Sequence, residues 1–295
     1  MFLSPFLIIE RNKMKYDNLL ELRGQPAGYQ KAFLEILGLF LLIGIWQAVS
    51  LYIGRTGILP SPLIPIKVAA GDQYGSVLTS IPELWMQDLL LKNIFYSLYL
   101  NAMGYLIAIS VALPLGFMIG LSPVANGLFS RPVDAVRFLP LTALTGIFIA
   151  WFGIYSNMKI LFLAFGIFVY LVPVVAQRIW EVEDVYIQTA QTLGASKWQQ
   201  IFKVFMPAAF SKLSDDIRIL TAISWTYIIV AELINNEGGI GALAYRSARQ
   251  GRLDKSFMLL FIIILLGIGQ DRLFAFIDKK MFKHKYVKIE QRKTS

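Results

Sequence analysis

The sequence of 295 residues contains no cysteine and a single histidine, His284. Without cysteine the chain cannot form a disulfide, use a thiol nucleophile or bind a metal through thiolates. The histidine lies in a basic tail, apart from any cluster of metal ligands, and no set of nucleophile, base and orienting residue can be recognised. These absences predict a chain that is not an enzyme and has no metal site.

A phosphate-binding loop is also missing, because no G-x-x-x-x-G-K-[ST] motif occurs in the sequence. Two glycine clusters, "NNEGGIG" at 235–241 and "GIG" at 267–269, contain no lysine. We therefore expect that this chain does not bind ATP by itself.

Charge is scarce. Charged residues make up 16% of the chain, against roughly 25% in soluble domains. Hydrophobic residues make up 56% and the mean hydropathy is +0.59, so the composition predicts a membrane protein. The net charge of +9 would by itself suit a nucleic acid or an anionic lipid as partner. The placement of the positive charges decides between these explanations.

Six apolar stretches approach the roughly 20 residues that a membrane-spanning helix needs. They are continuous rather than alternating, which argues against the strands of a membrane barrel. The sequence therefore predicts an all-α integral membrane protein with six transmembrane helices, at about 36–53, 94–121, 138–155, 158–177, 208–232 and 257–277.

Lysine and arginine are distributed unequally between the segments that connect these spans. One set of segments, which includes both termini, holds 18 of them, and the opposite set holds 8. By the positive-inside rule both termini are cytoplasmic, and membrane orientation explains most of the net charge. The predicted layout is a cytoplasmic N-terminal segment at 1–35, a transmembrane domain at 36–277 with a cytoplasmic loop at about 179–207, and a basic cytoplasmic tail at 278–295.

The first nine residues, "MFLSPFLII", are too short for a span and lack the features of a signal peptide. Met14 is an alternative start, and an interfacial or disordered tip is the other interpretation.

The cytoplasmic loop resembles a soluble pair of helices inserted between two apolar spans. In "EVEDVYIQTAQTL" at 181–193, apolar residues recur at helical spacing, and Gly194 then provides a turn. Ser196 and Gln199 fit a capping box for a second helix. We expect Pro207 to end that helix. Its apolar side chains are predicted to form one face: Trp198, Ile201, Phe202 and Phe205.

"TAQTLGASKWQQIFKVF" also resembles a DNA-binding helix-turn-helix. A recognition helix must project freely into a groove, whereas this segment is joined to a membrane span at both ends. We therefore expect no nucleic-acid partner.

The spacing within the loop resembles the cytoplasmic loop of permease subunits of binding-protein-dependent ABC importers. That motif consists of Glu-Ala-Ala, three residues, Gly, nine residues, Ile, any residue and Leu-Pro. Here Gln188 and Thr189 replace Glu-Ala. The other matching positions are Ala190, Gly194, Val204, Met206 and Pro207.

The resemblance extends over about residues 36–282 and points to the nitrate, sulfonate, taurine and bicarbonate class. It rests on "SLYLNAMGYLIAISVALPLGFMIGLS" (97–122), "FLPLTALTGIFIAWFGI" (138–154), "AELINNEGGIG" (231–241) and "GIGQDRLFAFIDKKMF" (267–282). The usual second proline of the third span is absent near Leu144 and Thr145.

This resemblance implies a type I importer fold in a bacterial inner membrane. It also implies a dimer with a second permease chain, most simply a homodimer, an external solute-binding protein, and two ATPase subunits that bind ATP and magnesium in place of this chain. The loop would then couple to the ATPase subunit. The residues that we expect to take part are Ala190, Gly194, Ser196, Trp198, Phe202 and Pro207.

Polar residues inside predicted spans are candidates for a solute pathway or gate. They are Glu232, Trp225, Thr226 and Thr142, with Thr145 and Ser224 beside them. Glu232 would either line a gate or act as a buried structural acid, and both interpretations stay open. Serine and threonine also make helix contacts.

Other charged residues have two interpretations each. Asp215 and Arg218 could pair at i, i+3, or these charges could form interfacial salt bridges and reach toward the membrane surface, which we favour for Asp215 and Asp216. Arg246, Arg249 and Arg252 could meet an acidic binding protein or an anion, or could form a solvated face.

We conclude from the sequence that the chain is the membrane-spanning subunit of an ATP-driven importer for a small solute. The class of the resemblance favours an oxyanion-like solute such as nitrate, sulfonate, taurine or bicarbonate. A stand-alone channel or secondary transporter is the alternative, although neither an ion-coupling site nor broken inverted repeats can be recognised. A membrane enzyme is the third possibility, disfavoured by the missing chemistry.

Overall fold

The computed structural model describes residues 28–53, 59–67, 74–86, 89–234, 237–283 and 285. The chain divides into two compact units, Met1–Leu78 and Thr79–Ser295, which we describe separately. In the first unit, helix α2 (Gly28–Ile53) is followed by strands β1 (Ile66–Lys67) and β2 (Tyr74–Gly75), which pair antiparallel. The hydroxyl of Ser61 donates to Gln47 of α2 at 3.0 Å, which ties the segment after α2 back to the helix.

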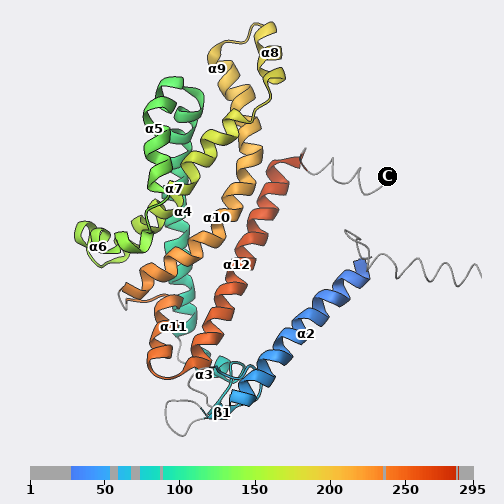
Figure 1. The fold of residues 1–295 in the computed structure, drawn as a ribbon, viewed down its shortest axis with the longest axis vertical. Helices are drawn as coiled ribbons and strands as arrows, with labels where there is room; N and C mark the ends of the chain where they lie inside the picture. The colour runs from blue at the N-terminus through green and yellow to red at the C-terminus, as the bar shows by residue number, and fades with distance from the viewer. Residues whose placement is uncertain are drawn as a thin grey trace, which may run out of the picture. The chain divides into compact units, whose positions relative to one another are not determined.

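All regular secondary structure that is described in the second unit is helical, and this unit contains the candidate site (Figure 1). Its helices are α3 (Ser80–Met86), α4 (Leu89–Leu121), α5 (Pro123–Val136), α6 (Leu141–Phe152), α7 (Ser156–Trp180), α8 (Asp184–Thr192), α9 (Lys197–Gln200), the π-helix η1 (Ile201–Phe205), α10 (Met206–Ile234), α11 (Ile240–Arg249) and α12 (Leu253–Met281).

Helix α7 forms the centre of this unit, and α4 packs along it through a row of small residues. These residues recur every four positions and face α7: Gly104, Ala108, Ala112, Gly116 and Gly120. A Cβ added to Gly116 would lie 2.5 Å from the Cβ of Val175, so only glycine permits this separation of the two backbones. Rows of small residues are typical of helix packing in membranes, where close van der Waals contact replaces the hydrophobic effect.

Five helical stretches are long and apolar enough to cross a membrane: Tyr29–Ile53, Leu90–Leu121, Ser156–Trp180, Lys197–Ile234 and Leu253–Met281. They confirm five of the six predicted spans. Each begins earlier than predicted, whereas the ends at Ile53 and Leu121 are as predicted and the other three lie slightly further on.

The remaining prediction, one continuous span at 138–155, is wrong in form. Helix α6 has 12 residues, which is about 18 Å of helix and too short to cross. It follows α5 at an angle of 102°, so the pair makes at most one broken span. The break occurs because Pro140 adopts an extended conformation at the start of α6, and Gly153, with φ of 75°, ends the helix.

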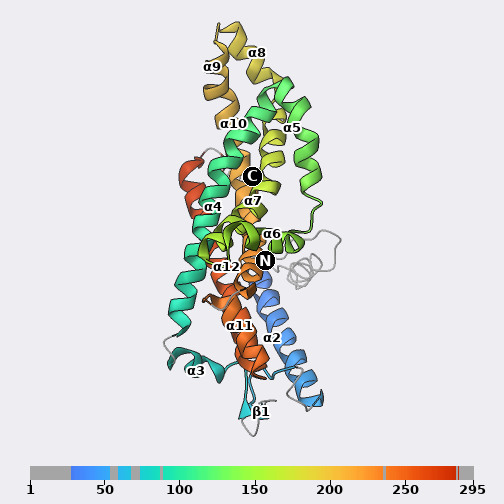
Figure 2. The same ribbon diagram turned by 90° about the vertical axis from the view of Figure 1, so that its left-hand side faces the viewer.

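Helices α8 and α9 lie at one end of the second unit, and α3 and α11 lie at the opposite end (Figures 1 and 2). The predicted loop and the segment that carries Arg246 and Arg249 in α11 are therefore separated by the length of the long helices.

Candidate functional site

The loop between α7 and α10, residues 181–205, is built as the sequence predicts up to its second helix. Helix α8 ends at a turn in which Gly194 has φ of 74°, a conformation that is costly for side chains with a Cβ. A Cβ on Gly194 would meet nothing within 4 Å, so the backbone angle and not crowding requires glycine. The N–H of Ala195 donates to the carbonyl of Ala190 at 2.9 Å and closes the turn.

The predicted capping box is confirmed. The N–H of Gln199 donates to the hydroxyl of Ser196 at 3.3 Å, and the N–H of Ser196 donates to the side chain of Gln199 at 2.8 Å. These bonds satisfy donors that a helix start leaves free, and they fix the direction in which α9 leaves the turn.

Pro207 does not end the helix, contrary to the prediction. Helices α9, η1 and α10 follow one another without a break, and Pro207 is the second residue of α10. The N–H of Met206 donates to the carbonyl of Ile201, five residues earlier. This wider π-turn relieves the collision that a proline ring makes with the preceding turn of a regular α-helix. The loop is therefore attached to α10 through a continuous rod.

The loop carries an apolar surface that is exposed in the single chain. We call it the loop apolar surface. Trp198 and Phe202 stack on each other, with ring centroids 6.0 Å apart and an angle of 19° between the rings. An exposed group of large apolar side chains is typical of a site that binds another molecule. Its members, with their exposed fractions, are Val185 (65%), Tyr186 (57%), Leu193 (81%), Trp198 (69%) and Phe202 (58%).

The four residues predicted to form one apolar face of the second helix point in two directions. Trp198 and Phe202 are exposed. Ile201 and Phe205 turn toward the body of the unit and line a hollow of about 440 Å³ together with residues of α7 and the end of α4, including Ile179 and Gly120. The helical spacing identified the apolar residues, but it could not show that two of them face inward. Among the other expected coupling residues, Ala190 is half-buried, and Gly194, Ser196 and Pro207 are exposed.

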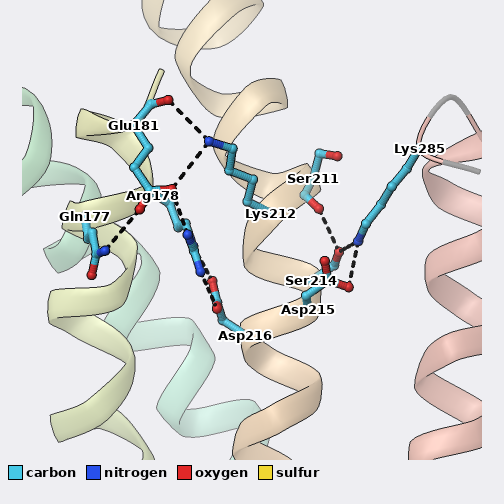
Figure 3. A network of polar contacts seen from close by, with 9 residues as sticks. All are labelled: Gln177, Arg178, Glu181, Ser211, Lys212, Ser214, Asp215, Asp216 and Lys285. Atoms are coloured by element: carbon cyan, nitrogen blue, oxygen red, sulfur yellow. Dashed lines mark hydrogen bonds and ion pairs between the residues drawn. The ribbon is translucent and has the colours of Figure 1, made fainter. Parts of the chain in front are cut away.

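The stems of the loop are joined by ion pairs (Figure 3). Arg178 at the end of α7 donates to both carboxylate oxygens of Asp216 in α10, at 2.7 and 2.8 Å. It also donates to Glu181 at 2.7 Å, and Lys212 lies 3.4 Å from the same carboxylate. The hydrogen bond from Arg178 lowers the pKa of Glu181, so this carboxylate is ionised at neutral pH.

Asp215 and Asp216 both form salt bridges, as the second interpretation expects, and Asp216 pairs with Arg178. Arg218 pairs with Asp271 of α12, with Nη2 to Oδ2 at 2.7 Å, and Asp215 pairs with Lys285 at 2.7 Å. Charged side chains on neighbouring helices compete with the i, i+3 neighbour for the same ion pair. The spacing of residues in one sequence does not show which helices are neighbours.

Glu232 is fully buried near the opposite end of the unit. It accepts hydrogen bonds from the hydroxyl of Ser97 in α4 at 2.5 Å and from the N–H of Gly241 at 2.8 Å. Gly239 has φ of 107°, and a Cβ there would lie 2.1 Å from the carboxylate carbon. The carboxylate therefore lies against the first turn of α11, where free N–H groups favour a negative charge. Through its two hydrogen bonds this residue of α10 connects α4 and α11.

Sequence reasoning missed the partners of Glu232. Asn93 accepts from the N–H of Gly239 at 2.6 Å, and Ser97 accepts from the N–H of Ile240 at 2.9 Å. The available signal was the four-residue spacing of Asn93, Ser97 and Asn101 in an otherwise apolar helix, since polar groups inside a span need partners.

The other pathway candidates do not gather at one place. Trp225 is buried, and its indole N–H donates to Gln270 of α12 at 2.9 Å. Gln270 in turn donates to Asn101 at 3.3 Å, so Trp225 belongs to a polar contact among three helices. Thr226 and Thr142 are exposed in the single chain, on α10 and α6 respectively.

One group of charged residues lies away from the loop, around Arg252 and Glu83. Arg252 pairs with Asp254 at 2.8 Å and with Glu83 of α3 at 2.9 Å. Burial opposes ionisation of Glu83, but the hydrogen bond from Lys255 and the nearby charges outweigh it and lower the pKa of this carboxyl.

Lys159 is fully buried, and its ammonium lies 5.3 Å from the ring centroid of Tyr96. Within the described ranges no group of three or more potential metal ligands occurs.

Comparisons with known proteins agree with this geometry. Residues 112–283, more than half of the chain, match the family described as "Binding-protein-dependent transport system inner membrane component". The putative aliphatic sulfonates transport permease protein SsuC of Bacillus subtilis is 27% identical over 82% of this chain and 84% of its own length. The taurine transport system permease protein TauC of Escherichia coli is 27% identical over 66% of this chain and 68% of its own length.

Among solved structures, the fold is similar to a chain of the MetNI methionine ABC transporter in an inward-facing conformation. The TM-score is 0.56 at 18% identity, over 70% of this chain and 98% of that chain. A similarity at this identity supports the fold alone.

Proposed function

Because the chain belongs to the family of binding-protein-dependent transport system inner membrane components, we propose that it passes a small oxyanion through the inner membrane and that its α7–α10 loop docks on a separate ATPase subunit. The chain is the membrane-spanning, non-catalytic subunit of an ABC importer and has the type I importer fold. Because the family is shown, the alternative of a channel or secondary transporter that works alone no longer applies.

The loop apolar surface is the observation that carries the docking proposal. Trp198 and Phe202 present a stacked aromatic pair beyond the ends of the long helices, and an aromatic anchor of this kind fits an apolar groove on a partner protein. Gly194 and Ser196 set the angle at which the pair is presented, Ala190 closes the turn, and Pro207 lies where the rod enters α10. ATP and magnesium then bind to the partner, since this chain has no phosphate-binding loop.

The orientation and layout follow from this docking. The N-terminal segment at 1–35 and the basic tail at 278–295 lie in the cytoplasm. Residues 36–277 form the transmembrane permease domain, and its loop at about 179–207 lies in the cytoplasm. An external binding protein delivers the solute at the end that contains α3 and α11.

Relatives named for aliphatic sulfonates and taurine support a small oxyanion as the solute. A second copy of the chain completes the pathway, and Thr142 and Thr226, which are exposed in the single chain, face that copy or the solute. Glu232 and Trp225 support the pathway indirectly by holding helices together.

Co-purification tests the docking proposal. The chain is co-expressed with its ATPase subunit, and the double variant Trp198→Glu, Phe202→Glu is compared with the conservative variant Trp198→Phe, Phe202→Leu. We expect the charged variant to insert normally and to lose the ATPase subunit, while the conservative variant retains it. Normal recovery of the ATPase subunit with the charged variant would refute docking through this surface.

A further inference from the structure

The segment of α10 directly after the loop contains an unusual density of charge. In "KLSDDIR" at 212–218, four charged side chains each have a partner on another segment of the chain. We call them the α10 charge cluster. The pairs are Lys212 with Glu181, Asp215 with Lys285, Asp216 with Arg178, and Arg218 with Asp271. Figure 3 shows the first three.

The pair of Arg178 with Asp216 joins α7 to α10 with defined geometry. Two parallel N–H to oxygen bonds form, at 2.7 and 2.8 Å, and a third guanidinium nitrogen donates to Glu181. Such bidentate bonds fix the relative orientation of two groups as well as their distance. The exposed fractions of the two side chains are 28% and 13%, so protein atoms cover most of both.

The end of α7 is held on its other side as well. The indole N–H of Trp180 donates to the carbonyl of Gly120, the penultimate residue of α4, at 3.0 Å. A Cβ on Gly120 would lie 2.7 Å from the side chain of Ile179, so the two helices are in close contact here. The last turns of α4 and α7 therefore form one packed support for Arg178.

Helix α12 is tied to the same part of α10. Arg218 makes a second bidentate pair, with Asp271. Lys285 lies 2.7 Å from Asp215 and 3.3 Å from Asp278. The charge cluster thus connects α10 to the two long helices that flank it.

These contacts decide what moves with the loop. The loop continues into α10 as an unbroken rod. On the other side, the chain connects it to α7 through residues 181–183, and Ile201 and Phe205 face the end of α7 across a hollow. The body of α10 packs against α7 in one buried core, and the ion pairs extend this attachment to the ends of the two helices, where the loop joins them.

We propose that Arg178 and Asp216 are positioning residues for coupling, because they make the ends of α7 and α10 move as one body when the loop is displaced. The inference rests on the proposed function, in which the ATPase subunit displaces the loop. Glu181 and Lys212 support Arg178 from the side of the loop.

The test uses the full importer in vesicles, with its ATPase subunit and binding protein. The variants are Arg178→Gln and Asp216→Asn. The matched control is Arg137→Gln, because Arg137, which directly follows α5, pairs with Asp134 of that same helix at 3.1 Å and joins no second helix through this pair. Three quantities are measured for each: the amount of ATPase subunit in the complex, ATP turnover without binding protein, and the stimulation of turnover by binding protein.

We expect both variants to keep the ATPase subunit and the unstimulated turnover. The stimulation should fall about 5-fold or more, the lower end of typical coupling between linked sites, while Arg137→Gln stays at the original value. A purely stabilising role would lower the amount of complex and leave the stimulation per complex unchanged. That result would overturn the proposal.

The absence of cysteine permits a second measurement that is independent of folding yield. In the double variant Arg178→Cys, Asp216→Cys, a short bifunctional thiol reagent can replace the ion pair with a covalent link. Stimulation should be low before the link forms and should recover afterwards in the same molecules. No recovery after complete linkage would contradict the proposal. Loss of the ATPase subunit from the unsubstituted complex would instead refute the proposed function.

Discussion

Replacement of Glu232 by alanine tests whether this carboxylate is a structural acid. The carboxylate accepts two hydrogen bonds, from Ser97 and from the N–H of Gly241, in a fully buried position. Each donor left without a partner costs about 1–3 kcal/mol, so Glu232→Ala should destabilise the folded chain by about 2–6 kcal/mol in the sum of two such donors. Glu232→Gln keeps the side-chain size and one acceptor oxygen, and it should cost about half as much.

The assay is the yield of inserted, monodisperse protein and its thermal unfolding in detergent. Glu237→Ala is the control, because Glu237 is exposed and lies in the same connection to α11. We expect a low yield for Glu232→Ala, near-normal transport per inserted molecule for Glu232→Gln, and no change for the control. Normal stability of Glu232→Ala would refute the structural role. A normal yield of Glu232→Gln with altered transport would indicate a gate instead.

Three further predictions concern single positions. Gly194 has φ of 74°, and no atom lies within 4 Å of the position a Cβ would take. Gly194→Val should therefore cost about 1–2 kcal/mol and lower the ATP turnover that the binding protein stimulates. Equal effects of Gly194→Val and Gly194→Ala would contradict a left-handed turn. Gly116→Ala should lower the unfolding temperature by forcing α4 from α7, at a cost of about 1–3 kcal/mol, while Gly127→Ala, with nothing within 4 Å, serves as control. The pKa of Glu83 is lowered below 4.5 despite its burial, chiefly by Lys255. Its ion pairs should therefore stabilise the fold above pH 4.5 and weaken as the pH falls through the lower pKa of the folded state. Because Glu83 is half-exposed, these ion pairs contribute less than about 1 kcal/mol. If Glu83→Gln left the pH dependence of unfolding unchanged, this reasoning would be refuted.

Local signals in the sequence predicted the loop well. Ser196 and Gln199 form the expected capping box, and Gly194 makes the expected turn, because both depend on residues that lie within a few positions of each other. Continuous apolar runs likewise located five spans, since bilayer thickness sets a length that a sequence window can measure.

Features that depend on neighbouring helices were not predictable from spacing. The break before α6 was hidden because apolar residues continue on both sides of Pro140. Arg218 forms a bidentate pair with Asp271, which lies 53 positions away in the sequence. The division of the loop's aromatic face followed from the packing of Phe205 against α4 and α7, and no pattern in residues 196–207 records that packing.

The role of Glu232 shows the same limit. The sequence identified it as an acid within a span and left two roles open, a pathway gate or a buried structural acid. The start of α11 and the polar residues of α4 together specify its hydrogen bonds, and those residues lie 9 and 135 positions away.

The most direct test of the account is uptake of radiolabelled taurine and alkanesulfonate into vesicles that contain the purified chain, alone or with its ATPase subunit and binding protein. The account predicts accumulation only when the chain, both partners and ATP are present together, and loss of accumulation with the Trp198→Glu, Phe202→Glu variant. Equal uptake by the chain alone, without ATP, would contradict the assignment of this protein as one subunit of an ATP-driven importer.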